Sequence, residues 1–229
     1  PGYTQEENIG LMAQGVKDPM APPNVLTAGG WKEANYEVTN KGTIDFTTSE
    51  KSTAIYAESA RVKNAGTIKL GESSTGIYGV YKADTPSLTG VTNTVKVDTT
   101  ANSNISLGKG STGMYLVNAE HLNTAGGTIE SVTGATNNVG IYAINGEVTG
   151  DATYSTNSNN FKKLVMDNKS NINLGKGSVG IYTRGKGTAS AERNTVTNEG
   201  NITVGDALTE APAVGIYVEN TNLTQGNTG

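Results

Sequence analysis

The sequence STGIYGV at residues 74–80 recurs along the chain and determines its fold. Each of its six copies has a tyrosine preceded by an aliphatic residue and, one position earlier, by glycine or alanine. The six tyrosines are Tyr56, Tyr78, Tyr115, Tyr142, Tyr182 and Tyr217. A degenerate copy near the start of the chain has Met12 in the tyrosine position. Repetition every few tens of residues is typical of folds built from stacked repeats.

Two further segments precede most copies. One has the form Asn-x-Gly-x-Ile-x-Leu, as at residues 64–70, and the other is an aliphatic residue just upstream of it. One repeat therefore consists of three short strands. The recurring asparagines are interpreted as a ladder at a corner, where the asparagine and the glycine that follows are expected to adopt positive φ. These asparagines are Asn40, Asn64, Asn168 and Asn198.

Alternation predicts which side chains of the tyrosine strand face inward, because strand residues point to opposite faces with period two. Ile77 is flanked two positions away by Thr75 and Gly79, which are β-branched or small, and we assign this set to a narrow core. The opposite face then carries Gly76, the tyrosine and a variable residue. We predict that the tyrosines form an outward structural ladder, with the glycines leaving room for the rings to stack.

Composition indicates the class of fold. A chain of 229 residues with 34% hydrophobic residues, 17% charged residues and 30 glycines is too polar for a conventional core and too regular for disorder. Repeats rich in Gly, Thr, Asn and β-branched residues favour strands over helices. We therefore predict an all-β, right-handed parallel β-helix of three-strand coils, with about six to seven rungs in one domain over residues 1–229.

The spacing of the repeats is uneven. Counted from Met12, the intervals between tyrosine positions are 44, 22, 37, 27, 40 and 35 residues. Most of the excess follows the tyrosine strand, in inserts at about 14–35, 81–94, 145–161 and 184–194. Inserts at one corner of a solenoid project from one edge, which is commonly the binding face.

The inserts contain the aromatic residues that the ladder does not use. Aromatic side chains on loops are favoured contacts for protein and sugar ligands, so we predict a loop-built ligand-binding surface. The alternative for any single ring is that it fixes its loop to the wall of the solenoid. The predicted ligand-binding residues are Trp31, Tyr36, Tyr81, Tyr154 and Phe161.

Motifs for catalysis and metal binding are scarce. His121 is the single histidine and there is no cysteine, so His/Cys spacing gives no metal site, and we expect no metal and no cofactor. The aspartates occur mostly singly and in different coils, whereas glycosidic cleavage uses paired carboxylates. A net charge of -4 with scattered Lys and Arg argues against a nucleic-acid partner. We therefore expect no enzymatic activity, although a carboxylate pair could still converge in space.

The segments NAGTIKLGESSTGIYG (residues 64–79) and NKSNINLGKGSVGIYT (168–183) resemble the passenger domains of the large autotransporter adhesins (type Va) of fusobacteria. The resemblance covers essentially the whole chain through its repeat. It implies a secreted β-helix stalk, part of a longer passenger, on the bacterial cell surface and anchored in the outer membrane by a C-terminal barrel not included here. It also implies a host-cell receptor protein or glycan, or a partner bacterial surface protein, as the ligand. The GDSGS nucleophile segment of the serine-protease autotransporters does not occur.

Three hypotheses follow. In the first, the chain is a monomeric segment of a surface adhesin, with a rigid stalk and a ligand-binding surface built from the inserts. In the second, it is a purely structural spacer and binding occurs elsewhere in the parent chain. In the third, it is a β-helical enzyme that acts on glycans.

Overall fold

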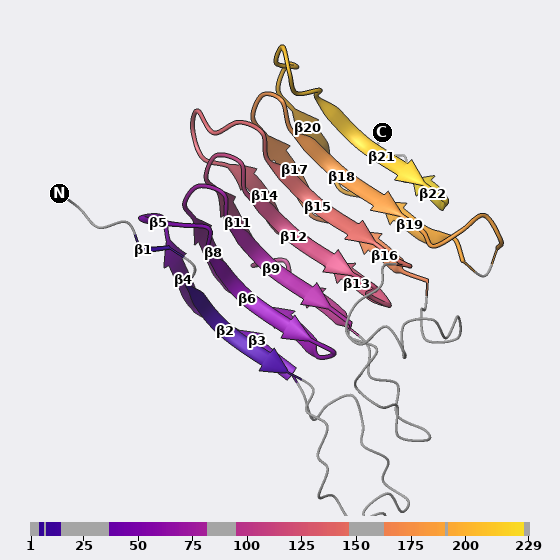
Figure 1. The fold of residues 1–229 in the computed structure, drawn as a ribbon, viewed down its shortest axis with the longest axis horizontal. Helices are drawn as coiled ribbons and strands as arrows, with labels where there is room; N and C mark the ends of the chain where they lie inside the picture. The colour runs from indigo at the N-terminus through magenta and orange to yellow at the C-terminus, as the bar shows by residue number, and fades with distance from the viewer. Residues whose placement is uncertain are drawn as a thin grey trace, which may run out of the picture.

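The computed structural model describes residues 5–6, 8–14, 37–81, 95–146, 163–190 and 192–226. These residues form three parallel sheets of seven, six and seven strands that wind into a right-handed β-helix (Figure 1). Strands pair in register from one coil to the next, so that Tyr56 lies beside Tyr78 and Ile55 beside Ile77. The predicted fold class is confirmed.

Each full coil contributes one strand to each sheet. The tyrosine sheet contains β2 (Ile9–Gln14), β6 (Thr53–Glu58), β9 (Thr75–Val80), β12 (Thr112–Val117), β15 (Val139–Ile144), β18 (Val179–Arg184) and β21 (Val214–Glu219). The asparagine sheet contains β3 (Glu37–Asn40), β7 (Arg61–Asn64), β10 (Lys96–Thr99), β13 (His121–Thr124), β16 (Val165–Asn168), β19 (Asn194–Asn198) and β22 (Thr221–Gln225). The isoleucine sheet contains β4 (Thr43–Phe46), β8 (Thr67–Leu70), β11 (Asn104–Leu107), β14 (Thr128–Ser131), β17 (Asn171–Leu174) and β20 (Ile202–Val204). A short parallel pair, β1 (Gln5–Glu6) and β5 (Ser49–Glu50), lies beside the first coil.

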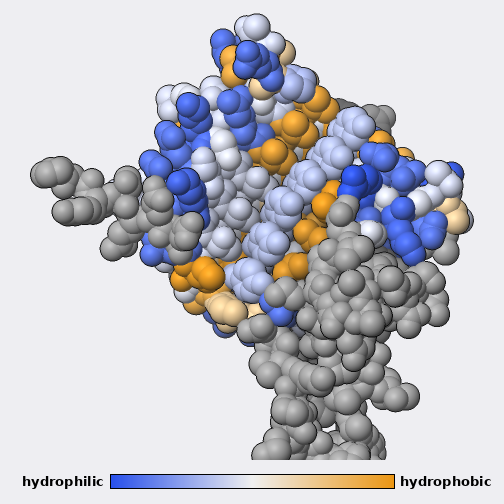
Figure 2. All heavy atoms as spheres, in the orientation of Figure 1, coloured by the Kyte–Doolittle hydropathy of each residue, from blue (hydrophilic) through white to orange (hydrophobic). Residues whose placement is uncertain are grey.

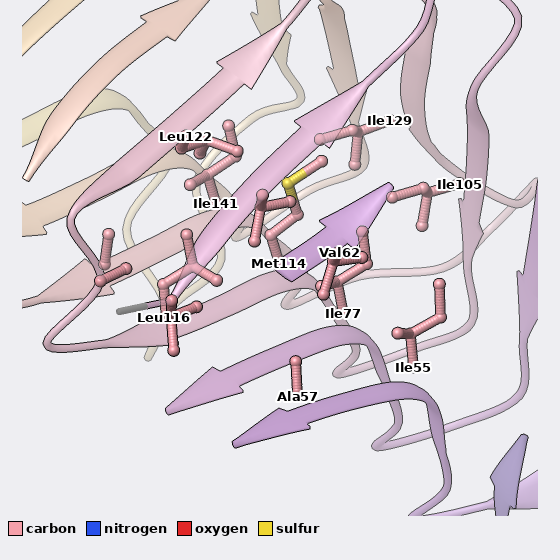
Figure 3. Packing of buried hydrophobic residues seen from close by; sticks show 14 of the residues in the cluster. Ile55, Ala57, Val62, Ile77, Ile105, Met114, Leu116, Leu122, Ile129 and Ile141 are labelled. Carbon is pink, nitrogen blue, oxygen red and sulfur yellow. The ribbon is translucent and has the colours of Figure 1, made fainter. Parts of the chain in front are cut away.

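Aliphatic side chains from all three sheets meet along the axis of the solenoid. Figure 3 shows Ile77 and Met114 of the tyrosine sheet pointing toward Val62 of the asparagine sheet and Ile105 of the isoleucine sheet. These side chains are almost completely buried. Burying one such side chain stabilises the fold by roughly 1.5–3 kcal/mol relative to leaving it exposed. Each added coil buries several of these side chains.

The inward face of the tyrosine sheet differs from the prediction. A Cβ atom built on Gly76 would lie 3.1 Å from Cγ2 of Ile105, in the core, and Ala54 in the equivalent position is 0% exposed. Thr75, which we assigned to the core, is half-exposed. Two successive residues therefore face inward where the chain enters the tyrosine sheet, and the ladder of paired residues skips the glycine between Thr75 and Ile77. The assignment of the glycines to the outer face was wrong, because alternation requires regular strand geometry.

Positive φ occurs at other corners than the one we expected. Lys51, Ser73, Gly110, Asn137 and Gly177 have φ between 51° and 68°, in the turns that lead into the tyrosine strands. The ladder asparagines do not have positive φ. Among the described residues at the asparagine corner, positive φ occurs only in the fourth copy of the repeat, at Gly126 and Gly127.

Glycine is favoured at the asparagine corner because adjacent coils approach closely there. A Cβ atom on Gly66 would lie 2.0 Å from the carbonyl oxygen of Gly42 in the preceding coil. The requirement is therefore steric, and the expectation that positive φ selects glycine at this corner was wrong.

Candidate functional site

The tyrosine rings form one column on the outer face of the tyrosine sheet. Successive ring centroids are 4.8 to 5.5 Å apart, and the ring planes differ by 3° to 19°, from Tyr56 to Tyr217. Figure 2 shows this face, where a band of pale side chains runs across the sheet with hydrophobic side chains on both flanks. Strand pairing at about 4.8 Å brings identical rings to stacking distance. Stacking of each pair of rings stabilises the fold by roughly 0.5–1.5 kcal/mol.

Aliphatic residues at the ends of three strands pack against the tyrosine rings. Val80, Val117 and Ile144 form a cluster outside the main core and are only 4 to 7% exposed. The rings are therefore held by contacts with these aliphatic side chains as well as by stacking on their neighbouring rings. The ladder therefore stabilises the contact between coils.

Three tyrosines of the ladder have a raised pKa. Burial raises the pKa of Tyr56, and the hydrogen bond that its hydroxyl donates to Glu58 Oε2 (2.8 Å) raises it further. Burial likewise raises the pKa of Tyr115 and of Tyr182. A phenol usually ionises near pH 10, so these three remain protonated under physiological conditions.

Replacing Tyr142 with alanine is expected to lower the free energy of unfolding by about 2 kcal/mol. The change removes two ring contacts, each with centroids 4.8 Å apart, and the packing of the ring against the aliphatic cluster. Tyr142→Phe keeps the ring and is the matched control, with an expected change below about 0.5 kcal/mol. Urea denaturation followed by circular dichroism measures both. Equal stability of the alanine and phenylalanine variants would contradict a stabilising role for stacking.

The ladder offers ring edges and not ring faces to a ligand. The four inner rings have a neighbouring ring on each side, so a sugar cannot stack on them. The column ends at Tyr56, because the residue beside it in β2 is Met12, which is 55% exposed. At the other end of the column Tyr217 is 46% exposed, and it is the most exposed ring of the ladder.

The connections between the tyrosine and asparagine sheets differ in length from coil to coil. After β6 and β12 the connection is residues 59–60 and 118–120, whereas longer segments follow β2, β9, β15 and β18. All four long segments leave from the same end of the tyrosine sheet and return to the asparagine sheet. The positions that we predicted as inserts thus share one corner of the solenoid.

Of the five aromatic residues that we predicted to bind ligand, one is described by the structure. Tyr81 is 7% exposed, belongs to the main core cluster and donates its backbone N–H to the carbonyl oxygen of Val117 (3.0 Å). Its burial favours the alternative interpretation, in which the ring fixes the start of the segment to the wall. Trp31, Tyr36, Tyr154 and Phe161 lie outside the described residues.

A row of ion pairs that the sequence analysis did not identify crosses the outer face of the asparagine sheet. Arg61 lies between two carboxylates, with Nη2 2.6 Å from Asp98 Oδ2 and Nε 3.7 Å from Glu37 Oε2. His121 is next to this row, with Nε2 4.0 Å from Asp98 Oδ1. An alignment of the repeats could have predicted these pairs, because the charged residues Glu37, Arg61 and Lys96 occupy one position in successive strands. Within the described part of the chain, no group of three or more His, Cys, Asp or Glu residues could hold a metal ion.

Three in-register parallel sheets around an aliphatic core place the molecule among the pectate lyase-like β-helices. Residues 8–229 match the family model of the BigA third pectate lyase-like domain. The chain belongs to this family, and it is therefore a domain of the type found in bacterial surface proteins. No curated protein and no solved structure matches the chain. The described residues contain no helix that could cross a membrane.

Proposed function

We propose that this chain is a segment of a bacterial adhesin that attaches the cell to host cells or to other bacteria. The β-helix is the stalk, and the segments at one corner build the surface that binds a receptor protein, a glycan or a partner bacterial surface protein. The parent protein would be an autotransporter of type Va, with its barrel in the outer membrane. The observation that carries the proposal is the return of long connections to the same corner in four coils.

The regularity of the solenoid supports a role in presenting loops. Each coil is joined to both neighbours by in-register ladders, which leaves little freedom to bend between coils. Coils with long connections, at β9 and β15, are separated by the coil of β12, which has a short one. Because coils rise by about 4.8 Å, the connections after β9 and β15 begin roughly 10 Å apart, and those after β15 and β18, in adjacent coils, begin about 4.8 Å apart.

Two of the described carboxylates have partners within the solenoid. Asp98 is paired with Arg61 and Asp45 accepts hydrogen bonds from Thr47, so both carboxylates serve the structure. The hydrogen bonds with Thr47, followed by its pairing with Lys69, lower the pKa of Asp45. A glycan-cleaving site needs a carboxyl group with a raised pKa beside an ionised one.

Replacing the β15 connection tests the proposal directly. Residues 145–164 are exchanged for residues 118–120, which make the same connection after β12. We expect the purified variant to keep its circular dichroism spectrum and to attach to epithelial cells or partner bacteria several-fold less than the parent chain, measured by flow cytometry. The same exchange at residues 185–193 and at 81–95 shows which corner segment contributes most.

A chain that attaches to none of these cells supports the spacer hypothesis instead. A chain that attaches equally with and without all the long connections would contradict a loop-built surface. Release of reducing ends from a panel of polysaccharides would support the enzyme hypothesis.

A further inference from the structure

The outer face of the tyrosine sheet has no charged residue in its central strands. In β9, β12 and β15 the outward positions hold threonine or valine at the start of the strand, the ladder tyrosine, and valine or isoleucine at the end. Charged residues occupy the last position only in strands nearer the ends of the solenoid, as Glu58, Arg184 and Glu219. A centre depleted of charge is the compositional signal of a protein interface.

The other two sheets present ion pairs on their outer faces. The asparagine sheet carries the pair of Arg61 with Asp98, and the isoleucine sheet carries the pair of Lys69 with Asp45 (3.4 Å). The lack of charge is therefore a property of the tyrosine face and not of the repeat as a whole. Figure 2 shows hydrophobic side chains on both flanks of the ring band on this face. A contiguous surface of this kind, bounded by polar residues, is typical of an interaction site.

The tyrosine face has a ridge and a valley. The stacked rings form the ridge and present their edges outward. Three residues earlier in each strand, about 10 Å away, a row of half-exposed β-branched side chains forms the valley. The valley consists of Thr53, Thr75, Thr112, Val139, Val179 and Val214. Both features repeat once per coil, so a partner that fits the whole face needs the same repeat.

A second copy of the chain has this repeat by construction. Rotation by 180° about an axis parallel to the solenoid places the ridge of each copy over the valley of the other. The same rotation keeps equal coils level, so every ring meets a small side chain of its own coil in the other copy. We propose that the tyrosine face is the interface of a two-fold symmetric dimer, in which the two solenoids lie side by side and point the same way.

The size of the face is sufficient for a reversible dimer. Seven strands about 4.8 Å apart, each six residues long at about 3.3 Å per residue, give a face of roughly 30 by 20 Å. Two such faces bury about 1,200 Å² together, which is at the lower end of specific interfaces. We therefore expect a Kd of about 10–100 μM.

This inference goes beyond the proposed function, because it concerns the wall of the solenoid and not the segments at its corner. It also departs from the monomer that we expected from the sequence. Sedimentation velocity of the whole chain over a concentration range tests it. We expect a reversible shift from the mass of one chain to twice that mass, with no larger species, since a two-fold interface is closed.

Two variants identify the face. Val139→Arg and Thr75→Arg each place a charge in the valley and are expected to weaken dimerisation at least about tenfold, because the charge would be buried without a partner. Val165→Arg is the matched control: Val165 is also half-exposed and begins β16, but it lies in the asparagine sheet. The control should dimerise like the parent chain. Circular dichroism confirms that each variant is folded, and Thr75→Arg replaces a residue that is already polar.

The outcomes distinguish this proposal from the adhesin. A chain that stays monomeric at millimolar concentration, or a dimer that both valley variants leave unchanged, would overturn the interface. Oligomers that grow with concentration would indicate association through the strand edges at the ends of the solenoid and would overturn it as well. A dimer that depends on the valley, in a chain that attaches to no cell, would support the interface and contradict the adhesin. A monomer that attaches through its corner segments would do the reverse.

Discussion

Replacing Asn168 with alanine is expected to lower the free energy of unfolding by about 3 kcal/mol. The side chain is 0% exposed and forms three hydrogen bonds: Nδ2 donates to Asn198 Oδ1 (2.6 Å) and to the carbonyl oxygen of Ser170 (3.1 Å), and Oδ1 accepts from Thr124 Oγ1 (2.8 Å). Alanine leaves these three partners buried without a replacement, and each unpaired group costs about 1–3 kcal/mol. Urea denaturation followed by circular dichroism gives the change.

Asn173 provides the matched control for this substitution. It lies five residues further along in β17, its side chain is exposed, and Asn173→Ala is expected to change stability by less than about 0.5 kcal/mol. A loss of stability at Asn168 no larger than at Asn173 would show that the buried ladder is dispensable.

The ladder explains why asparagine recurs at one position of the repeat. Asn40 Nδ2 donates to Asn64 Oδ1 (2.8 Å), and Asn64 Nδ2 donates to Ser103 Oγ (2.6 Å), so each amide joins two coils. Asparagine suits this role because it carries a donor and an acceptor on one short side chain. The sequence showed the recurrence, and the strand register predicted that the amides would lie above one another.

Recurrence in the sequence predicts the sheets because identical residues in successive coils must become neighbours. The alignment of Tyr78 with Tyr115 follows from the repeat alone, and the structure pairs them. The direction of a side chain within one coil does not follow from recurrence. It depends on where the backbone departs from regular strand geometry, and this is why Gly76 and Thr75 were assigned to the wrong faces.

The candidate site was less predictable from sequence than the fold. The long connections lack the repeat, so nothing in the pattern fixes where their aromatic side chains lie, and Tyr81 is buried although it begins such a segment. The ion pair on the outer face of the asparagine sheet joins Arg61 with Asp98, which are 37 positions apart in the sequence. Only the stacking of one coil on the next brings them together.

The glycine before each aliphatic residue sets how closely the coils approach, and valine at Gly140 is expected to be the most damaging single change in the solenoid. A Cβ atom on Gly140 would lie 2.5 Å from the carbonyl oxygen of Gly180 and 2.9 Å from Cγ2 of Ile172. Backbone on one side and a core side chain on the other leave no direction in which a branched side chain can move. We expect a loss of about 4 kcal/mol or more for Gly140→Val.

Alanine at the same position should cost less, about 2 kcal/mol, because Ala54 shows that the first full coil accommodates one methyl group in this position. Gly215 is the matched control: it occupies the same position in the last tyrosine strand, where an added Cβ atom would meet nothing within 4 Å. Gly215→Ala is expected to be neutral or to stabilise slightly, because alanine restricts the unfolded chain. Thermal and urea denaturation of the three variants give the comparison. If Gly140→Val and Gly215→Ala were equally stable, contact between coils would not be the reason for glycine in the repeat, and its role would then lie in the folding of the strand itself.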